Sequence, residues 1–245
     1  MTQKLKEIKQ IKEAPKMVPV IAETEVLVVG SGPAGLAAAL GAAREGAETM
    51  LLERYGCFGG AITQVGVESI AWYRHEGTID TEGIGIEFEK RAKDIGATRK
   101  MPQSQSEALD ADLFKYVADK LVQEAGILPL LHCMAVEAVM EGDTIKGIIT
   151  ESKSGRQAIL AKRVIDASGD ADIADLAGAP WHKTPKDEMM GVTVMFSCAG
   201  VNKERFLAYV KENPSTYGDW GKNWNIQTTG KEDNLFSPYL EAPFN

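Results

Sequence analysis

The chain has 245 residues, of which 44% are hydrophobic and 25% are charged, and its formal net charge is −8. This composition is ordinary for a soluble globular protein of one or two domains, and the net negative charge argues against a general nucleic-acid or anionic-membrane surface. The longest apolar runs are too short to span a bilayer, and the charged N-terminus lacks the apolar core of a signal peptide. We therefore expect a cytoplasmic protein with no membrane or nucleic-acid partner.

The three cysteines are Cys57, Cys133 and Cys198. They lie far apart in the sequence and form no C-x-x-C pair, so the sequence predicts neither a redox disulfide nor a zinc site. No bound metal is expected.

Residues 1–23 are expected to form a lead segment ahead of the first domain. Leu5, Ile8 and Ile11 have the spacing of one helical face, so a short amphipathic helix is one interpretation, which the two following prolines would end. The lysines of this segment are interleaved with glutamates, which is typical of a solvated lead-in.

Residues 25–53 (EVLVVGSGPAGLAAALGAAREGAETMLLE) predict a strand, a turn, a helix and a second strand. Gly30, Gly32 and Gly35 form G-x-G-x-x-G at the end of the apolar strand Val26–Val29. In the dinucleotide-binding fingerprint the first glycine permits a sharp turn, the second lets the backbone approach a diphosphate, and the third allows close helix packing. The alternative, that these glycines serve only tight packing, is disfavoured by the acid that follows at the required spacing.

That acid is Glu53, which ends the second strand and can accept hydrogen bonds from ribose hydroxyl groups, favouring a ribose without a 2′-phosphate. Backbone N–H groups of the turn that holds Ser31, Pro33 and Ala34 are expected to face the diphosphate. Two interpretations of Arg54 remain open: it contacts the adenosine part or a nearby phosphate, or it pairs with Glu53.

The middle of the chain predicts a loop, two helices and a strand. Residues 54–80 are rich in glycine, and residues 82–95 predict a helix. Asp110 is the expected N-cap of a second helix, whose buried face is marked by four apolar residues at helical spacing: Phe114, Val117, Leu121 and Ala125. Residues 127–132 then predict a strand that returns to a parallel sheet.

Residues 134–161 predict a three-stranded antiparallel meander, because apolar and polar residues alternate between the turns EGDT and SKSG. A separate strand at Arg163–Asp166 would return to the main sheet, and a helix after Asp170 would end near Gly178. Most of the tryptophans follow residue 180, where a second domain is expected to begin.

Within that second domain, the sequence predicts a strand at Val192–Cys198 and a helix at Lys203–Glu212. The chain then stops at PYLEAPFN without a recognisable terminating element.

Two distant segments together resemble a known signature. RVIDASGD (residues 163–170) predicts a strand that runs into a small-residue turn with an acid, and Gly59-Gly60 follow the second strand of the opening unit. This combination resembles the two-part FAD signature of glutathione-reductase-like flavoproteins. The stretch over residues 118–180 is similar to the FAD-dependent oxidoreductase family, in which Thr is usual at the position of Ser168.

The resemblance covers roughly residues 24–200. It implies an α/β fold with a doubly wound, parallel, Rossmann-like FAD-binding sheet and an antiparallel β-meander layer over residues 24–180, and the start of a substrate-binding domain over residues 181–245. FAD is the implied cofactor. Besides the glycine turn and Glu53, the family positions implied to face it are Gly59, Gly60, Thr63, Val136, Ser168, Gly169 and Asp170.

Structural alternatives to these roles stay open. Gly59 and Gly60 are compatible with a glycine-rich loop that holds no ligand, and Asp170 with an acid-rich, solvated helix start. The role of Val136, a backbone contact to the adenine edge, is implied by the resemblance alone.

The candidate for catalysis is His75, in the loop Ser69–Gly77 (SIAWYRHEG). Dehydrogenation by a flavin requires a base that removes a proton, and a histidine beside the ring is suited to this; a plain surface loop is the alternative. Cys57 has no second cysteine five residues later, so a dithiol disulfide reductase is not expected.

The sequence thus predicts an FAD-dependent oxidoreductase that transfers a hydride between a small organic substrate and the flavin. Two alternatives remain: a non-redox adenine-dinucleotide-binding protein of the thiazole-synthase type, and an FAD-holding subunit of a larger electron-transfer complex. Members of the resembled family are roughly twice as long as this chain, so a C-terminal half or a second chain is expected to complete the FAD site. A homo-oligomer is also compatible with the sequence.

Overall fold

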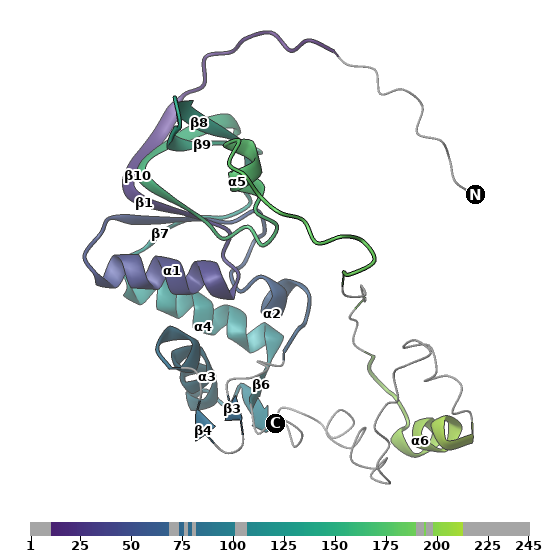
Figure 1. The fold of residues 1–245 in the computed structure, drawn as a ribbon. Coiled ribbons are helices and arrows are strands. Elements are labelled where there is room, and N and C mark those ends of the chain that lie inside the picture. Colours follow the sequence, from purple (N-terminus) through teal and green to yellow (C-terminus); the bar gives the residue numbers. More distant parts are fainter. Residues whose placement is uncertain are drawn as a thin grey trace.

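The computed structural model describes residues 11–68, 74–75, 78–79, 82–100, 107–189, 194 and 198–212. Its centre is a six-stranded sheet with the order β7-β2-β1-β10-β9-β8 (Figure 1). The strands are β7 (Leu128–Leu130), β2 (Thr49–Leu52), β1 (Val20–Val29), β10 (Gly155–Asp166), β9 (Thr144–Ser152) and β8 (Met134–Glu141). The first four are parallel to one another, β9 is antiparallel to β10, and β8 is antiparallel to β9. The predicted α/β fold with a parallel part and a meander is therefore confirmed.

The parallel part and the meander share two long strands. Within β1, the residues that pair with β2 are Val26–Val29. Within β10, the residues that pair with β9 are 155–160. β1 and β10 pair with each other along both regions, from Val20 and Ala158 to Val29 and Asp166. The prediction of separate strands at 157–161 and 163–166 was therefore wrong: only Lys162 lies between them, and no glycine or proline breaks the ladder.

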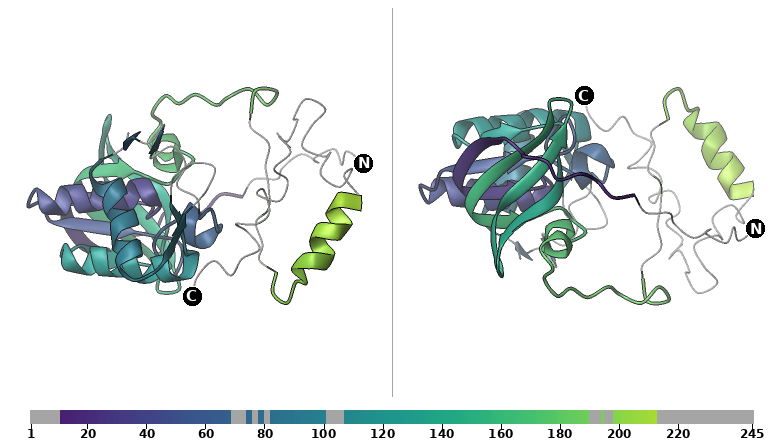
Figure 2. Two further views of the ribbon diagram at one scale, coloured as in Figure 1. Left: turned by 90° about the horizontal axis from the view of Figure 1, so that it is seen from below. Right: turned by 90° about the horizontal axis from the view of Figure 1, so that it is seen from above.

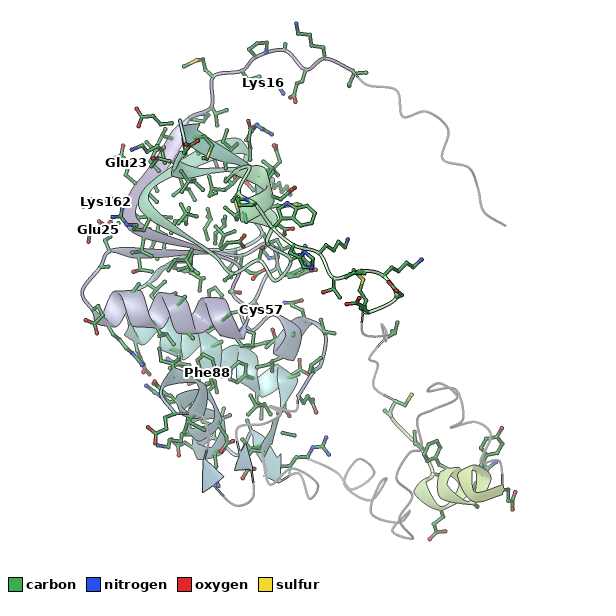
Figure 3. The ribbon with its side chains drawn as sticks, in the orientation of Figure 1. Lys16, Glu23, Glu25, Cys57, Phe88 and Lys162 are labelled. Atoms are coloured by element: carbon green, nitrogen blue, oxygen red, sulfur yellow. The ribbon has the colours of Figure 1, made fainter. Side chains whose placement is uncertain are left out.

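Two helices lie on one face of the sheet, α1 (Pro33–Arg44) and α4 (Ala111–Glu124), and α3 (Ile84–Asp94) packs against these two helices on the side away from the sheet (Figure 1). Buried apolar side chains of these helices form one cluster with Val28 and Leu51 of the strands. Phe88 of α3 meets Phe114 of α4 edge-to-face, with ring centroids 5.8 Å apart, and Figure 3 labels Phe88 among these helices. This layer is the larger of the two cores.

The opposite face of the sheet carries a second core. Because side chains alternate along a strand, Leu27, Val29, Met50 and Leu52 point away from the three helices. They pack with residues of the meander and with Ile173 of α5 (Asp172–Leu176), whose helix lies on this side (Figure 1). Both faces of β2 and of Leu27–Val29 in β1 are thus buried, as the centre of a doubly wound sheet requires.

The predicted helix boundaries are confirmed where turn chemistry defines them. Asp110 is the N-cap of α4, and its Oδ1 atom accepts hydrogen bonds from the N–H groups of Asp112 and Leu113, each at 2.9 Å. Gly126 follows the end of α4 with a φ of 67°, a left-handed conformation that glycine adopts at little cost.

Short elements complete the described chain: α2 (Ala61–Gln64), the pair β3 (Arg74–His75) and β4 (Thr78–Ile79), the pair β5 (Thr98–Lys100) and β6 (Glu107–Leu109), and α6 (Lys203–Glu212). The predicted helix at 203–212 is confirmed as α6, which lies apart from the sheet in both views of Figure 2. Residues 11–19 form no helix or strand before β1, and the rest of the predicted lead helix lies outside the described residues. So does most of the predicted strand at 192–198.

None of the helices that the structure describes combines the length and the apolar character that crossing a bilayer requires.

Candidate functional site

A cavity of about 530 Å³ lies at the carboxyl ends of β1, β2 and β10. In open α/β sheets this edge is where ligands bind. Its walls come from residues 29–34, 52–55, 60–61, 64–65, 133–135, 167–170 and 172–173. A shallower hollow of about 690 Å³ lies elsewhere, beside Glu23, Glu25 and Lys162 (Figure 3), and contains no predicted site residue.

The N-terminus of α1 opens into this cavity. Gly32 is the N-cap; no side chain accepts a hydrogen bond from the first turn, and that turn holds no acidic residue. The first N–H groups of a helix have no partner within the helix, so an end without a side-chain cap that borders a cavity is suited to an anion. Pro33 is the first helical residue and has no N–H, so the expectation of a donor there is corrected; Ala34 and Gly35 carry the available amides.

The three glycines of the turn are required for different reasons. Gly30 has a φ of 94°, and a Cβ there would lie 2.3 Å from the carbonyl oxygen of Ala167. A Cβ on Gly35 would lie 1.8 Å from the carbonyl oxygen of Gly30. A Cβ on Gly32 would instead have Gly60 Cα, at 3.9 Å, as its nearest neighbour. The fold itself therefore demands Gly30 and Gly35, whereas at Gly32 the space that a side chain would fill belongs to the cavity.

Glu53 ends β2, lines the cavity and is only 5% exposed. Its Oε2 atom accepts hydrogen bonds from the N–H of Ser31 at 2.9 Å and from the Ser31 hydroxyl at 2.5 Å, and its Oε1 atom accepts one from the N–H of Tyr55 at 2.9 Å. A carboxylate offers about four acceptor sites, so three protein donors leave capacity for a ligand hydroxyl. The side chain of Ser31 had not been singled out from the sequence.

Arg54 also lines the cavity. Its guanidinium carbon lies 4.8 Å from the centroid of the Tyr55 ring, a cation–π contact. Among the residues that the structure describes, Arg54 forms no ion pair, and the carboxylate of Glu53 is held by Ser31 and Tyr55 instead. Of the two interpretations left open, the pairing with Glu53 is thus not formed.

The second glycine pair packs against the first turn. The N–H of Gly59 donates a hydrogen bond to the carbonyl oxygen of Ser31 at 2.9 Å, and a Cβ on Gly60 would lie 2.5 Å from Gly32 Cα. Gly60 lines the cavity, whereas Gly59 and Thr63 do not. The Thr63 hydroxyl donates to the carbonyl oxygen of Phe58 at 2.6 Å, which fastens this loop on itself.

The turn after β10 forms another wall of the cavity through Ser168, Gly169 and Asp170. It is braced by Asp166, which had not been predicted as a site residue. The Oδ1 atom of Asp166 accepts hydrogen bonds from the N–H of Ser168 at 3.0 Å and from its hydroxyl at 2.6 Å. Partial burial raises the pKa of the Asp166 carboxyl, but hydrogen bonds to its charged form outweigh burial and hold the pKa below its ordinary value.

The remaining predicted residues lie at the margin or outside the described part. Val136 of β8 falls where the pairing with β9 skips a residue, and its neighbour Ala135, not Val136, lines the cavity. His75 pairs with Thr78 through the backbone, but its side chain is outside the described residues. The predicted roles of both residues stay predictions.

Several cavity residues were not predicted from the sequence: Tyr55, Gln64, Val65, Cys133, Met134, Ala135, Asp172 and Ile173. Tyr55 directly follows the predicted pair of Glu53 and Arg54, which is a weak signal. The local sequence around the others indicates only core or surface positions, and the fold alone brings them to this edge of the sheet.

The chain is similar to several known proteins. Residues 25–240 match the family model for FAD dependent oxidoreductase. Thiamine thiazole synthase from Methanococcus vannielii is 30% identical over 183 residues, covering 66% of this chain and 63% of that protein. The 6-methylpretetramide 4-monooxygenase of Streptomyces rimosus is 27% identical over 178 residues, covering 66% of this chain and 42% of that protein.

Among solved structures, a geranylgeranyl bacteriochlorophyll reductase-like protein from Thermoplasma acidophilum has a TM-score of 0.49 at 23% identity, covering 64% of this chain and 42% of that chain. The chain spans less than two thirds of the length of each of these proteins. The family predicted from RVIDASGD and the glycine turn is confirmed: this chain belongs to the FAD-dependent oxidoreductase family, and FAD is the cofactor of that family.

Proposed function

We propose that the protein transfers a hydride between a small organic substrate and FAD. The observation that carries this proposal is the N-terminus of α1, whose first-turn amides have no side-chain acceptor and face a cavity that also holds the carboxylate of Glu53. An anion and a polyhydroxyl group are what these two elements bind, and the diphosphate and ribose of FAD supply both.

In this arrangement, the diphosphate lies over the turn from Gly30 to Gly35, where Gly32 leaves room for it. Glu53 accepts from a hydroxyl of the adenosine ribose, and Arg54 lies beside the adenosine part. The second wall, residues 168–170, meets the diphosphate and the ribityl chain. Backbone groups of β8 near Val136 are free to face adenine, because β8 is the edge strand of the sheet.

FAD supplies the redox chemistry by accepting or donating the hydride. The residues of this chain bind and orient the cofactor, and the backbone N–H groups of the glycine turn hold its diphosphate. We assign the proton-removing role to His75. We assign the start of the substrate-binding domain to residues 181–245, and the groups that complete the FAD site to a C-terminal half or a second chain.

A second function is supported by the similarity to thiamine thiazole synthases. On that alternative the same cavity binds an adenine dinucleotide that is not used as a flavin. A third possibility is that the chain holds FAD as one subunit of an electron-transfer complex. A partner that co-purifies at fixed stoichiometry would favour this possibility, and an active homomer would exclude it.

The ligand separates the first two functions. The protein should be purified together with the C-terminal half or second chain that completes the FAD site, because this chain alone is expected to bind FAD weakly or not at all. Its absorption spectrum should be recorded, and any bound molecule released by heat and identified by mass spectrometry. Released FAD, or binding of added FAD with a flavin absorption spectrum, supports the proposed function. An NAD-derived adenylated product supports the thiazole-type alternative, and a completed protein that neither carries nor takes up FAD overturns the flavin proposal.

The location of the ligand is tested by Gly32→Ala. Gly32 has an ordinary φ of −61° and room for a methyl group, so this variant should fold, yet the methyl group occupies the space assigned to the diphosphate. We expect FAD affinity to fall by about tenfold or more. Gly41→Ala is the matched control on the same helix, because a Cβ there meets nothing within 4 Å; it should leave binding unchanged.

A further inference from the structure

We propose that Asp166, which does not line the cavity, is the positioning residue that holds the second wall of the FAD site in its binding geometry. The inference rests on the proposed function, since it assigns residues 167–173 to cofactor contact. Its basis is the set of hydrogen bonds that one carboxylate accepts from both ends of this segment.

The two oxygens of Asp166 are divided between the two ends of the turn. Oδ1 accepts from the N–H and the hydroxyl of Ser168, and Oδ2 accepts from the N–H groups of Ile173 and Ala174, each at 3.0 Å. The Ser168 hydroxyl in turn accepts a hydrogen bond from the N–H of Asp172 at 2.9 Å. The carboxylate therefore closes the turn from its first residue to the start of α5.

The start of this turn is fixed against the glycine loop. The N–H of Ala167 donates to the carbonyl oxygen of Val29 at 2.8 Å, and the absence of a Cβ on Gly30 lets the Ala167 carbonyl lie close to that loop. Beyond Ala167, the side chain of Asp166 provides the bracing. Ala171 has a φ of 61°, a left-handed conformation that is unfavourable for a residue with a Cβ, so the closed turn is held against a local preference.

The consequence is a link between one carboxylate and the cavity wall. Ser168, Gly169, Asp170, Asp172 and Ile173 all line the cavity, and all lie within the segment that Asp166 spans. We call these hydrogen bonds of the Asp166 carboxylate the clamp. If the clamp opens at either end of the turn, the amide groups of the turn no longer hold a fixed position relative to α1, and the ligand loses part of its preorganised site.

Asp166→Asn removes the clamp with little change in shape. An amide side chain has one acceptor oxygen, so its NH₂ group must face the N–H groups of α5 or that of Ser168, and one end of the turn is released. Asp110→Ala is the matched control: it removes the carboxylate that caps α4, at a site that does not line the cavity, and so reports a loss of stability alone.

Three measurements on the full chain test the proposal: FAD affinity by titration, thermal unfolding without ligand, and hydrogen exchange of the amides of residues 168–174. We expect Asp166→Asn to bind FAD about tenfold more weakly than wild type and to exchange faster in this segment. Asp110→Ala should unfold at a lower temperature but retain wild-type affinity and exchange in this segment.

Wild-type affinity of folded Asp166→Asn, or unchanged exchange at residues 168–174, overturns the positioning role. If wild type binds no FAD even with the half or second chain that completes the site, the proposed function fails, and hydrogen exchange alone decides the role of Asp166 in ordering the turn.

Discussion

Ser31 and Glu53 are joined by two hydrogen bonds to a single carboxylate oxygen, one from the backbone N–H and one from the hydroxyl of the serine. Both residues are buried, and they come from the glycine turn and from the end of β2. The acid predicted to bind ribose therefore also fixes the loop predicted to bind the diphosphate. A change at Glu53 should alter stability as well as ligand binding.

Replacing this acid tests its structural role. Glu53→Gln places an NH₂ group against one of the backbone donors, Ser31 or Tyr55, and should lower the free energy of unfolding by about 1–3 kcal/mol. Ser31→Ala removes only the hydroxyl and keeps the N–H bond to Oε2, so it should cost about 1 kcal/mol. Urea unfolding of the two variants gives both values; equal losses would contradict the two-sided anchoring of Glu53.

Glu53 should also select the ribose. A 2′-phosphate placed beside this buried carboxylate meets a like charge, so ADP-ribose should compete with FAD for the cavity at least about tenfold better than its 2′-phosphorylated form. Competition titrations with the two nucleotides measure the difference, and Gly41→Ala serves as the control protein. If the two nucleotides compete equally well, the assignment of Glu53 to the ribose site is wrong.

Alanine at Gly35 and alanine at Gly41 should have opposite effects on the free energy of unfolding. Gly35→Ala forces a methyl group to within 1.8 Å of the Gly30 carbonyl, so this variant should lose about 3 kcal/mol or more of unfolding free energy, or fail to fold. Gly41→Ala, in the last turn of α1, should gain up to about 0.5–1 kcal/mol, because glycine weakens a helix relative to alanine. Urea unfolding tests both; a stable Gly35→Ala variant would contradict the close packing of α1 on the turn.

Acid should weaken the contribution of Asp166 to the stability of the fold. Burial raises the pKa of its carboxyl group, but the hydrogen bonds lower the pKa by more than burial raises it, so the folded-state pKa lies below the ordinary 3.8. A carboxyl group of this kind stabilises the fold above its unfolded pKa and loses that effect as the pH falls through the folded pKa. The difference in unfolding free energy between wild type and Asp166→Asn should therefore be complete at neutral pH and shrink below pH 3.8. Urea unfolding across this range measures it, and a constant difference would contradict the assignment.

The elements that the sequence predicted well share a local cause. The cap of α4 at Asp110 and the buried stripe of Phe114, Val117 and Leu121 depend on neighbours within a few residues, and the structure has them as expected. The single strand β10 was missed for the opposite reason. Its first half resembles a meander strand and its second half a Rossmann strand, and only pairing with the whole of β1 makes them one.

The glycine turn and the acid after the second strand were visible in the sequence alone, because backbone turns and strand ends follow from residue type and spacing. The sequence could not reveal that Asp166 braces the second wall, or that Gly32 borders open space while Gly35 is enclosed. The hydrogen bonds of Asp166 reach only two to eight residues along the chain, and the carbonyl that encloses Gly35 is that of Gly30. Their place in the site depends on contacts between segments more than 100 residues apart, such as Gly30 with Ala167. Such contacts are decided by how β1, β2 and β10 align in the sheet, and no local pattern records that alignment.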